Sequence, residues 1–358
     1  MLTFSAQNLS EIADKIFCRL GAPAPIAADV TSSLILSNLL GVDSHGVVRI
    51  RNYFDSIKSG AIVPQAEPTI VRENQIAVVM EGKRAFGQVV AKKAMRFALQ
   101  KAKNAAFGAS SFTGVYHIGR LGEFVEMAAA EGFVGLVLAN GSRPGGLVAP
   151  YGARQRMLGT NPIAFAIPAG SNPPLVADFS TSATSEGRVR IAFRKHEEVP
   201  FGLLIDRHGV PTQNPGDLYE GGALCTMGGY KGYALSLLVE VLGGIFSGAE
   251  TPLFPGYDYM HNGVFMLAID PTFFRPPSDY RAAVDFLFDS VRKALAADKM
   301  EGALIPGDPE RRHKLIREKH GIPLDEQTWE EITGVAAELG LELRSSEGYS
   351  APVTPDRH

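Results

Sequence analysis

Residues 41–53 read Gly-Val-Asp-Ser-His-Gly-Val-Val-Arg-Ile-Arg-Asn-Tyr, and they follow an apolar run that predicts a helix over residues 26–40. The two glycines beside the histidine remove side-chain bulk, which suits a backbone that approaches a ligand closely. If a helix begins near His45, then His45, Arg49 and Tyr53 share one face. An imidazole can give or take a proton near neutral pH, and a guanidinium can hold a carboxylate. Reduction of a 2-oxo acid requires this pairing, although an ordinary buried histidine beside surface arginines has the same pattern.

Helical periodicity continues at both ends of the chain, whereas the middle alternates between strands and helices. The sequence predicts terminal helices over residues 9–20, 26–40, 45–59, 280–296, 309–319 and 326–339. Between them it predicts strands over 69–72, 76–81, 107–115, 133–139, 163–167, 175–179 and 263–269, and helices over 89–105, 121–130 and 230–246. Buried strands interleaved with helices indicate an α/β fold whose sheet is covered on both faces. Residues 65–115 have the pattern of a small α+β unit.

The composition excludes several classes of protein. A chain of 358 residues with 45% hydrophobic residues can build substantial cores, and a net charge of -3 gives no cationic field for nucleic acid or a membrane surface. The two cysteines, Cys18 and Cys225, lie in unlike contexts, which argues against a disulfide framework or a cysteine-based zinc site. No basic leader or membrane-length apolar run is evident, so we expect a cytoplasmic protein.

Neither the Gly-x-Gly-x-x-Gly fingerprint nor the P-loop pattern occurs, so any dinucleotide must bind elsewhere than at a Rossmann turn. The predicted strand 175–179 runs into Ser180-Thr181-Ser182, whose hydroxyls and N–H groups could hold a phosphate at a helix start. A Ser/Thr-rich helix cap is the alternative. Lys231 lies between glycines where an apolar helix opens, and could reach a phosphate or stay exposed. Gly159-Thr160-Asn161-Pro162 has the signature of a bend before a strand.

A second histidine cluster, His117-Ile118-Gly119-Arg120, lies where a predicted strand gives way to a helix. Ends of strands in α/β sheets are where ligands usually bind. Together with His45 and Asp43, His117 could instead ligate a metal. We expect no metal site, because no His-x-His or His-x3-His pair occurs and the flanking glycines favour close backbone approach.

Taken together, these segments resemble the type 2 malate/L-lactate dehydrogenases, which are non-Rossmann NAD(P)-dependent 2-hydroxyacid oxidoreductases. That family includes ureidoglycolate, sulfolactate and 2,3-diketogulonate-type enzymes and the Δ1-pyrroline-2-carboxylate reductases. The matching segments appear in family order over about residues 5–340: 43–46 with Arg49, 117–119 with 126–128, 159–168, 178–182, 229–232 and 306–308. The form of residues 117–122 looks most like the hydroxycarboxylate dehydrogenase B branch.

The resemblance implies a fold of three parts and a homodimer whose active site lies near the subunit contact. The parts are a helical domain formed by both termini (1–64 and 280–358), a small α+β domain (65–115) and a non-Rossmann mixed-sheet domain that binds NAD or NADP (116–279). It also implies that His45 is the proton donor, that Arg49 clamps the carboxylate and that His117 is catalytic. Tyr53, Asn140 and Thr160 would be further substrate contacts.

By the same resemblance, cofactor contacts fall on three segments and two single residues. These are His117, Asn161, Val176, Asp178, Ser180, Thr181, Ser182, Tyr230, Lys231, Gly307, Asp308 and Pro309. Two departures from the family pattern stand out: Ser180 replaces a common alanine, and Asp308 replaces a frequent glutamate. Arg188, Arg190 and Arg194 could hold a 2′-phosphate, so the choice between NAD and NADP stays open.

The predicted function is hydride transfer between nicotinamide and a small 2-hydroxy or 2-oxo acid. Three alternatives remain from the residues alone. The first is a cyclic imino acid (Δ1-pyrroline-2-carboxylate) reductase on the same scaffold. The second is a metal-dependent hydrolase built on His45, His117 and Asp43, and the third is a nucleotide-binding protein without turnover.

Overall fold

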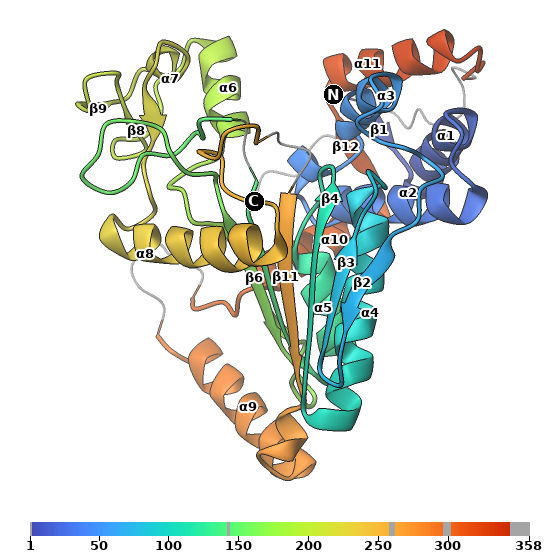
Figure 1. Cartoon of the computed structure of the whole chain (residues 1–358), viewed down its shortest axis with the longest axis vertical. Helices are drawn as coiled ribbons and strands as arrows, with labels where there is room; N and C mark the ends of the chain where they lie inside the picture. Colours follow the sequence, from blue (N-terminus) through green and yellow to red (C-terminus); the bar gives the residue numbers. More distant parts are fainter. Residues whose placement is uncertain (1, 142–143, 258–261, 296–301, 344–358) are drawn as a thin grey trace.

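A seven-stranded mixed sheet organises the computed structural model, which describes residues 2–141, 144–257, 262–295 and 302–343 (Figure 1). Across the sheet the order is β2 (Thr69–Glu73), β3 (Ala77–Glu81), β4 (Phe107–Val115), β11 (Asn262–Ile269), β5 (Val134–Ala139), β6 (Pro162–Ile167) and β7 (Leu175–Ser180). Strands β3 and β4 pair in parallel, and every other neighbouring pair in this sheet is antiparallel. The predicted α/β class and mixed sheet are therefore confirmed.

Helices lie on both faces of the sheet, with α4 (Gly87–Ala105) and α5 (Gly122–Ala130) on one side and α8 (Tyr230–Val239) on the other (Figure 1). Successive strand residues point to opposite faces, so Val137 of β5 belongs to the core that includes α4 and α5, whereas the adjacent Leu138 packs with Val239 of α8. The predicted alanine-rich face of α4 lies directly on β4. At Gly108 a Cβ would overlap the backbone of Ala98, so glycine is required for this close approach.

Both ends of the chain contribute to one further core. Strand β1 (Leu2–Phe4) pairs antiparallel with β12 (Ile322–Leu324), and neither strand was predicted from the sequence. The helices α1 (Ala6–Arg19), α2 (Ala24–Leu39), α3 (Arg49–Lys58) and α11 (Glu326–Glu338) pack around Phe17, Leu34, Tyr53 and Ile332. This core carries the segment 41–53 and sets it against the sheet.

A small three-stranded sheet stands apart from the main sheet in the upper left of Figure 1. It consists of β8 (Leu204–Ile205), β9 (Pro211–Thr212) and β10 (Ala223–Leu224), accompanied by α6 (Glu186–Lys195) and α7 (Gly216–Tyr219). These two-residue strands are too short to give a periodic signal, so the sequence did not predict them. Their core is separate and includes Val148, Val189 and Leu218.

Two helices near the C-terminus frame the β7 edge of the sheet. Helix α9 (Pro277–Arg292) extends away from the sheet (Figure 1), and its Asp285 carboxylate accepts the N–H groups of residues 170–172. Helix α10 (Asp308–His320) returns toward α2, with which it is in contact. In the part of the chain that the structure describes, no helix is both long and apolar enough to span a bilayer.

The main sheet runs without a break from the strands of residues 65–115 to those of residues 116–279. The boundary predicted after residue 115 therefore has no counterpart in the strand pairing. Among the described residues no strand pair crosses the boundaries predicted after residues 64 and 279, and β1 and β12 pair with each other inside the predicted terminal domain. The domain boundaries stay a prediction about folding units.

Candidate active site

The loop that carries His45 differs from the prediction. A short 3-10 turn, η1 (Asp43–His45), precedes Gly46, and the α-helix begins only at Arg49. The predicted helix over residues 45–59 is therefore wrong at its start, and His45 does not share a helical face with Arg49. Gly46 causes the break, because its backbone is extended and a Cβ there would overlap the Asn38 amide. That amide accepts the N–H of Val47 at 2.8 Å, which fixes the path of the loop.

The same loop is clamped from the C-terminal part of the chain. Arg317 of α10 donates two hydrogen bonds to the Asp43 carboxylate, at 2.6 and 3.0 Å, and a further one to the carbonyl of Asn38. The Asn38 side chain also donates to Asp43 at 2.7 Å. Because Asp43 is engaged in this way, it is not oriented as a metal ligand beside the histidines. Among the described residues no group of three His, Cys, Asp or Glu side chains is placed to hold a metal ion.

Removing the clamp should loosen the histidine loop. We expect Arg317→Ala to lower kcat/KM about tenfold, since a charge-assisted hydrogen bond typically contributes about 1.5–3 kcal/mol and this pair is partly solvent-exposed. The matched control is Lys314→Ala on the same helix, whose ion pair with Glu318 is exposed. Steady-state kinetics of both variants provide the test. Wild-type kcat/KM in Arg317→Ala would contradict a positioning role for the clamp.

The structure brings the two predicted histidines together. Their rings stack with centroids 5.2 Å apart, and Tyr53 Oη lies 2.9 Å from His117 Nδ1. Gln88, at the start of α4, donates its amide N–H to Tyr53 Oη at 2.6 Å. Arg49 is anchored by a bond from its Nε to the carbonyl of Ser44 at 2.7 Å. The set therefore combines two imidazoles, a phenol and a guanidinium, and only Gln88 was missed from the sequence.

Burial and nearby positive charge shift the titration of this group. Burial, followed by the charges of Arg49 and Arg120, lowers the pKa of His45 to about 4. The pKa of His117 is also lowered well below its usual value, by burial and then by Arg49 and His45. Burial raises the pKa of Tyr53. At neutral pH both imidazoles are therefore neutral in the free protein, so His45 can donate a proton only after an anion has offset the nearby charge.

Asn140 lies in a buried network, not among the side chains around His45. Its Nδ2 donates to Glu240 Oε1 at 3.0 Å and to the carbonyl of Glu250 at 2.9 Å, and its Oδ1 accepts the N–H of Gly263. Asn161 Nδ2 donates to the other oxygen of Glu240 at 2.6 Å. Both amide hydrogens of Asn140 are thereby used inside the fold, so neither is free to make the predicted contact with a substrate.

Glu240 is the centre of that network and was missed from the sequence. It begins a π-helical segment (Glu240–Gly244) that continues α8 into η3 (Ile245–Ser247). Burial raises the pKa of Glu240, while the amides of Asn161 and Asn140 act in the opposite direction. The carboxylate ties the end of β5 to the start of β6.

Several predicted cofactor residues gather where β6 begins and β7 ends. Thr181 is buried, and its hydroxyl donates to the carbonyls of Thr160 and Asn161 at 3.2 and 3.0 Å. The hydroxyls of Ser180 and Ser182 bond to each other at 3.0 Å. These side chains shape the turn, and the hydroxyl of Thr181 is directed to the backbone, not toward an open phosphate site.

The opening of α8 lies beside this turn, because the N–H of Met227 bonds to the carbonyl of Thr181. Tyr230 and Lys231 form the first turn of α8 and are both exposed. The ring of Tyr151 meets the ring of Tyr230 edge-on. An ammonium and an aromatic ring are thus presented to solvent next to residues 180–182.

A second group of predicted cofactor residues lies on β7 and at the start of α10. Asp178 is exposed, and its Oδ2 accepts the N–H of Gly122 at 2.7 Å. The N–H of Val176 bonds to the carbonyl of Pro306, which places Gly307 against the strand, while Pro309 lies in the first turn of α10. Asp308 is already paired with Arg292 and Arg311, at 3.1 and 2.7 Å. Burial would raise the pKa of Asp308, but the two arginines outweigh burial and lower it to about 2.

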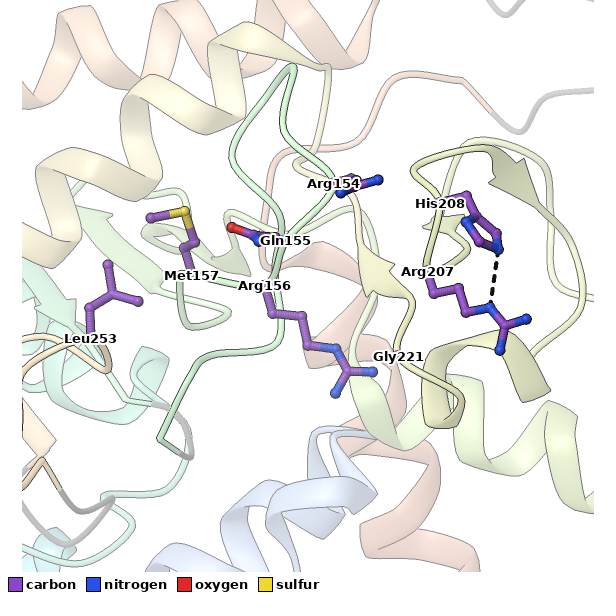
Figure 2. A pocket seen from close by; sticks show the side chains of 8 residues that line it. All are labelled: Arg154, Gln155, Arg156, Met157, Arg207, His208, Gly221 and Leu253. Carbon is purple, nitrogen blue, oxygen red and sulfur yellow. Dashed lines mark hydrogen bonds between the residues drawn. The ribbon is translucent and has the colours of Figure 1, made fainter.

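A surface cavity of about 650 Å³ lies elsewhere, on the side of the small sheet (Figure 2). Its lining is cationic and apolar and includes Arg154, Arg156, Arg207, His208, Met157 and Leu253. Arg156 is held by the carbonyls of Leu218 and Gly222. None of the predicted catalytic or cofactor residues lines this cavity, so the histidine pair and its surroundings are the better candidate site.

Comparison with known proteins points to one family. The model of the malate/L-lactate dehydrogenase family matches residues 4–333. Hydroxycarboxylate dehydrogenase B of Escherichia coli K12 is 37% identical over 97% of both chains. Sulfolactate dehydrogenase from Methanocaldococcus jannaschii superposes with a TM-score of 0.88 at 31% identity, covering 95% of this chain and 98% of the other. Δ1-piperideine-2-carboxylate reductase from Pseudomonas syringae superposes with a TM-score of 0.81 at 30% identity, covering 94% of this chain and 100% of the other.

Proposed function

Because this chain belongs to the malate/L-lactate dehydrogenase family, we propose that it transfers a hydride between NAD or NADP and a small 2-hydroxy or 2-oxo acid. The observation that carries the proposal is the stacked pair His45 and His117 beside Arg49. Two imidazoles supply proton transfer and hydrogen bonding at one carbonyl, and a guanidinium supplies the contact for an adjacent carboxylate.

The side chains near the β6 and β7 ends fit a dinucleotide. Lys231 offers an exposed ammonium for a phosphate, Tyr230 an exposed ring for stacking, and Asp178 an exposed carboxylate for a hydroxyl or amide. Gly307 has a φ of +98° and lies against Val176, so the chain can bend there without side-chain bulk. When bound, the nicotinamide supplies the hydride.

The protein's part in the reaction is to orient the acid and to handle one proton. In reduction, Arg49 would hold the carboxylate so that the neighbouring carbonyl faces His45 and His117. The bound carboxylate offsets the Arg49 charge that lowers the pKa of His45, which allows His45 to take up a proton and deliver it to the substrate oxygen. In oxidation, neutral His45 accepts the hydroxyl proton.

The low pKa of His45 predicts opposite pH dependences for the two directions. Oxidation needs neutral His45, so its kcat/KM should stay level as the pH falls from about 8 to about 5. Reduction needs protonated His45, so its kcat/KM should rise over the same interval. In the oxidation direction kcat/KM should fall only near pH 4, where His45 becomes protonated. Arg49→Gln should move this fall to higher pH, because it removes a positive charge that disfavours the imidazolium. A fall of the wild-type kcat/KM for oxidation near pH 6.5, the pKa of an ordinary histidine, would contradict this account.

The substrate is tested with a panel of acids and both reduced cofactors. We expect oxidation of NADH or NADPH by at least one of pyruvate, oxaloacetate and sulfopyruvate. The similarity to Δ1-piperideine-2-carboxylate reductase favours cyclic imino acids as the second candidate class. A protonated imine needs less acid assistance than a ketone, so an imine reductase would keep much of its activity in His45→Gln. Cofactor binding without turnover on any of these compounds would contradict the proposed function.

An exposed apolar face supports the further proposal that the protein is a homodimer. Leu237, Leu238, Val241, Ile245 and Phe246 follow one another along α8 and its continuation, with exposed fractions from 40% to 65%. A monomer rarely leaves so continuous an apolar strip in water. Analytical ultracentrifugation should give roughly twice the 38.4 kDa of one chain, and Val241→Glu with Ile245→Glu should shift it toward monomer. A monomeric wild type would overturn the proposal.

We also propose a cytoplasmic location. Cys18 and Cys225 are both free thiols in the structure, as a reducing compartment would keep them. Cell fractionation checks this, and recovery of the protein from an extracytoplasmic fraction would contradict it.

A further inference from the structure

A buried chain of hydrogen bonds ends on the imidazole of His117. Gln88 and Tyr53 are 0% and 1% exposed, and the Gln88 amide donates to Tyr53 Oη at 2.6 Å. Tyr53 Oη lies 2.9 Å from His117 Nδ1. The rings of Phe17, Phe86 and Tyr116 surround the phenol, so its hydroxyl has little freedom to find other partners.

The direction of the bond between Tyr53 and His117 follows from the bond between Gln88 and Tyr53, because Gln88 Nε2 is the amide atom that faces Oη. A tyrosine hydroxyl carries one hydrogen. Since the Gln88 amide already points a hydrogen at Oη, the hydroxyl hydrogen is directed to its other neighbour, His117 Nδ1. That nitrogen must then accept, and a neutral imidazole that accepts at Nδ1 carries its proton on Nε2.

We propose that Gln88 is a positioning residue that acts through Tyr53 to hold His117 neutral with its proton on Nε2. This inference rests on the proposed function and deepens it. His117 then acts only as a hydrogen-bond donor toward a substrate oxygen, and the proton that is transferred comes from His45. The resemblance implies that His45 is the proton donor, and the hydrogen-bond chain from Gln88 supplies a physical reason for that division of tasks between two similar imidazoles.

Protonation of His117 at Nδ1 would disrupt the hydrogen bonds that link Gln88, Tyr53 and His117. An Nδ1–H would meet a hydroxyl whose hydrogen already points at it, and the other side of Oη is taken by Gln88. The titratable or charged groups that face His117 in the described part of the chain are Arg49 and Tyr53 from α3 and His45 from η1. None of them is an anion at neutral pH, so none compensates the imidazolium. The hydrogen-bond chain and the electrostatics therefore favour the same neutral form.

The test reads the two nitrogens of His117 directly by ¹⁵N NMR of histidine-labelled full-length protein, with the signal assigned from its loss in His117→Asn. The wild type should show the proton on Nε2. Gln88→Met, which keeps the length but removes the donor, should give a mixture of the two tautomers. Ser56→Ala is the control, because Ser56 is buried on the helix of Tyr53 and its hydroxyl donates to the carbonyl of Asn52. It should leave the wild-type tautomer unchanged.

Kinetics on the same proteins supply the functional readout. We expect Gln88→Met to lower kcat/KM for a 2-oxo acid about tenfold, the usual weight of one hydrogen bond, with Ser56→Ala close to wild type. A proton on Nδ1 in the wild type, or an unchanged tautomer in Gln88→Met, would overturn the inference even if turnover is normal. The predicted spectra in a protein that turns over no acid would instead overturn the proposed function alone.

Discussion

His45→Gln lowers kcat for 2-oxo acid reduction by about 100- to 10,000-fold and leaves the KM of the acid nearly unchanged. Proton transfer by a positioned side chain contributes a factor of this size, and glutamine cannot transfer a proton at this position. Glutamine is similar in size and can still bond to Ser44, which lies 3.0 Å from His45 Nδ1. The loop should therefore persist, and the loss should fall on turnover.

His320→Gln serves as the control, since His320 is exposed at the end of α10. Steady-state kinetics and single-turnover measurements on both variants separate the chemical step from binding. Turnover of His45→Gln within a factor of about ten of wild type would remove His45 from the role of proton donor.

Arg49→Gln raises the KM for carboxylate substrates by about 10- to 100-fold, with a smaller effect on kcat. A charge-assisted pair contributes about 1.5–3 kcal/mol, which corresponds to this range. Arg51→Gln is a matched control on the same helix, because Arg51 pairs with Asp55 and Glu338 at the protein surface. It should behave as wild type.

A comparison of a 2-oxo acid with its amide sharpens that test. In the wild type the amide should be much the poorer substrate, because it lacks the charge that Arg49 recognises. In Arg49→Gln the difference between acid and amide should nearly disappear. If the variant still prefers the acid as strongly as the wild type does, another residue holds the carboxylate.

The sequence was sufficient to predict the strands of the main sheet because most of them carry several buried residues, although β2 is exposed along its whole length. Strand β5, for example, is a continuous apolar run, and its two faces each pack against helices. The pairing of β1 with β12 was not predictable, since three-residue strands at opposite ends of the chain give no periodic signal. The helix start at Arg49 was misplaced because the break depends on the Asn38 amide, which meets Gly46 only in the folded loop.

The candidate site likewise contains residues that the sequence could identify and residues that only the packing reveals. His45 and His117 have distinctive chemistry and glycines nearby in the sequence, so the sequence alone is enough to single them out, and Tyr53 follows on the segment that begins at His45. Glu240 lies within a predicted helix and Gln88 lies directly before one, where a buried amide or carboxylate looks like any surface residue. Their significance comes from what they touch, namely Tyr53 in one case and two asparagine amides in the other. Asn140 illustrates the converse, because only packing shows that its amide hydrogens are already used.

The central claim is that a hydride passes between nicotinamide and C2 of a small acid. Reduced cofactor carrying deuterium at the transferable C4 position, incubated with the protein and the acid identified from the panel, tests this most directly. Mass spectrometry and NMR of the product should show one deuterium bound to C2 of the 2-hydroxy acid and unlabelled oxidised cofactor. A product without deuterium at C2, or no product from any acid while the cofactor binds, would contradict the account.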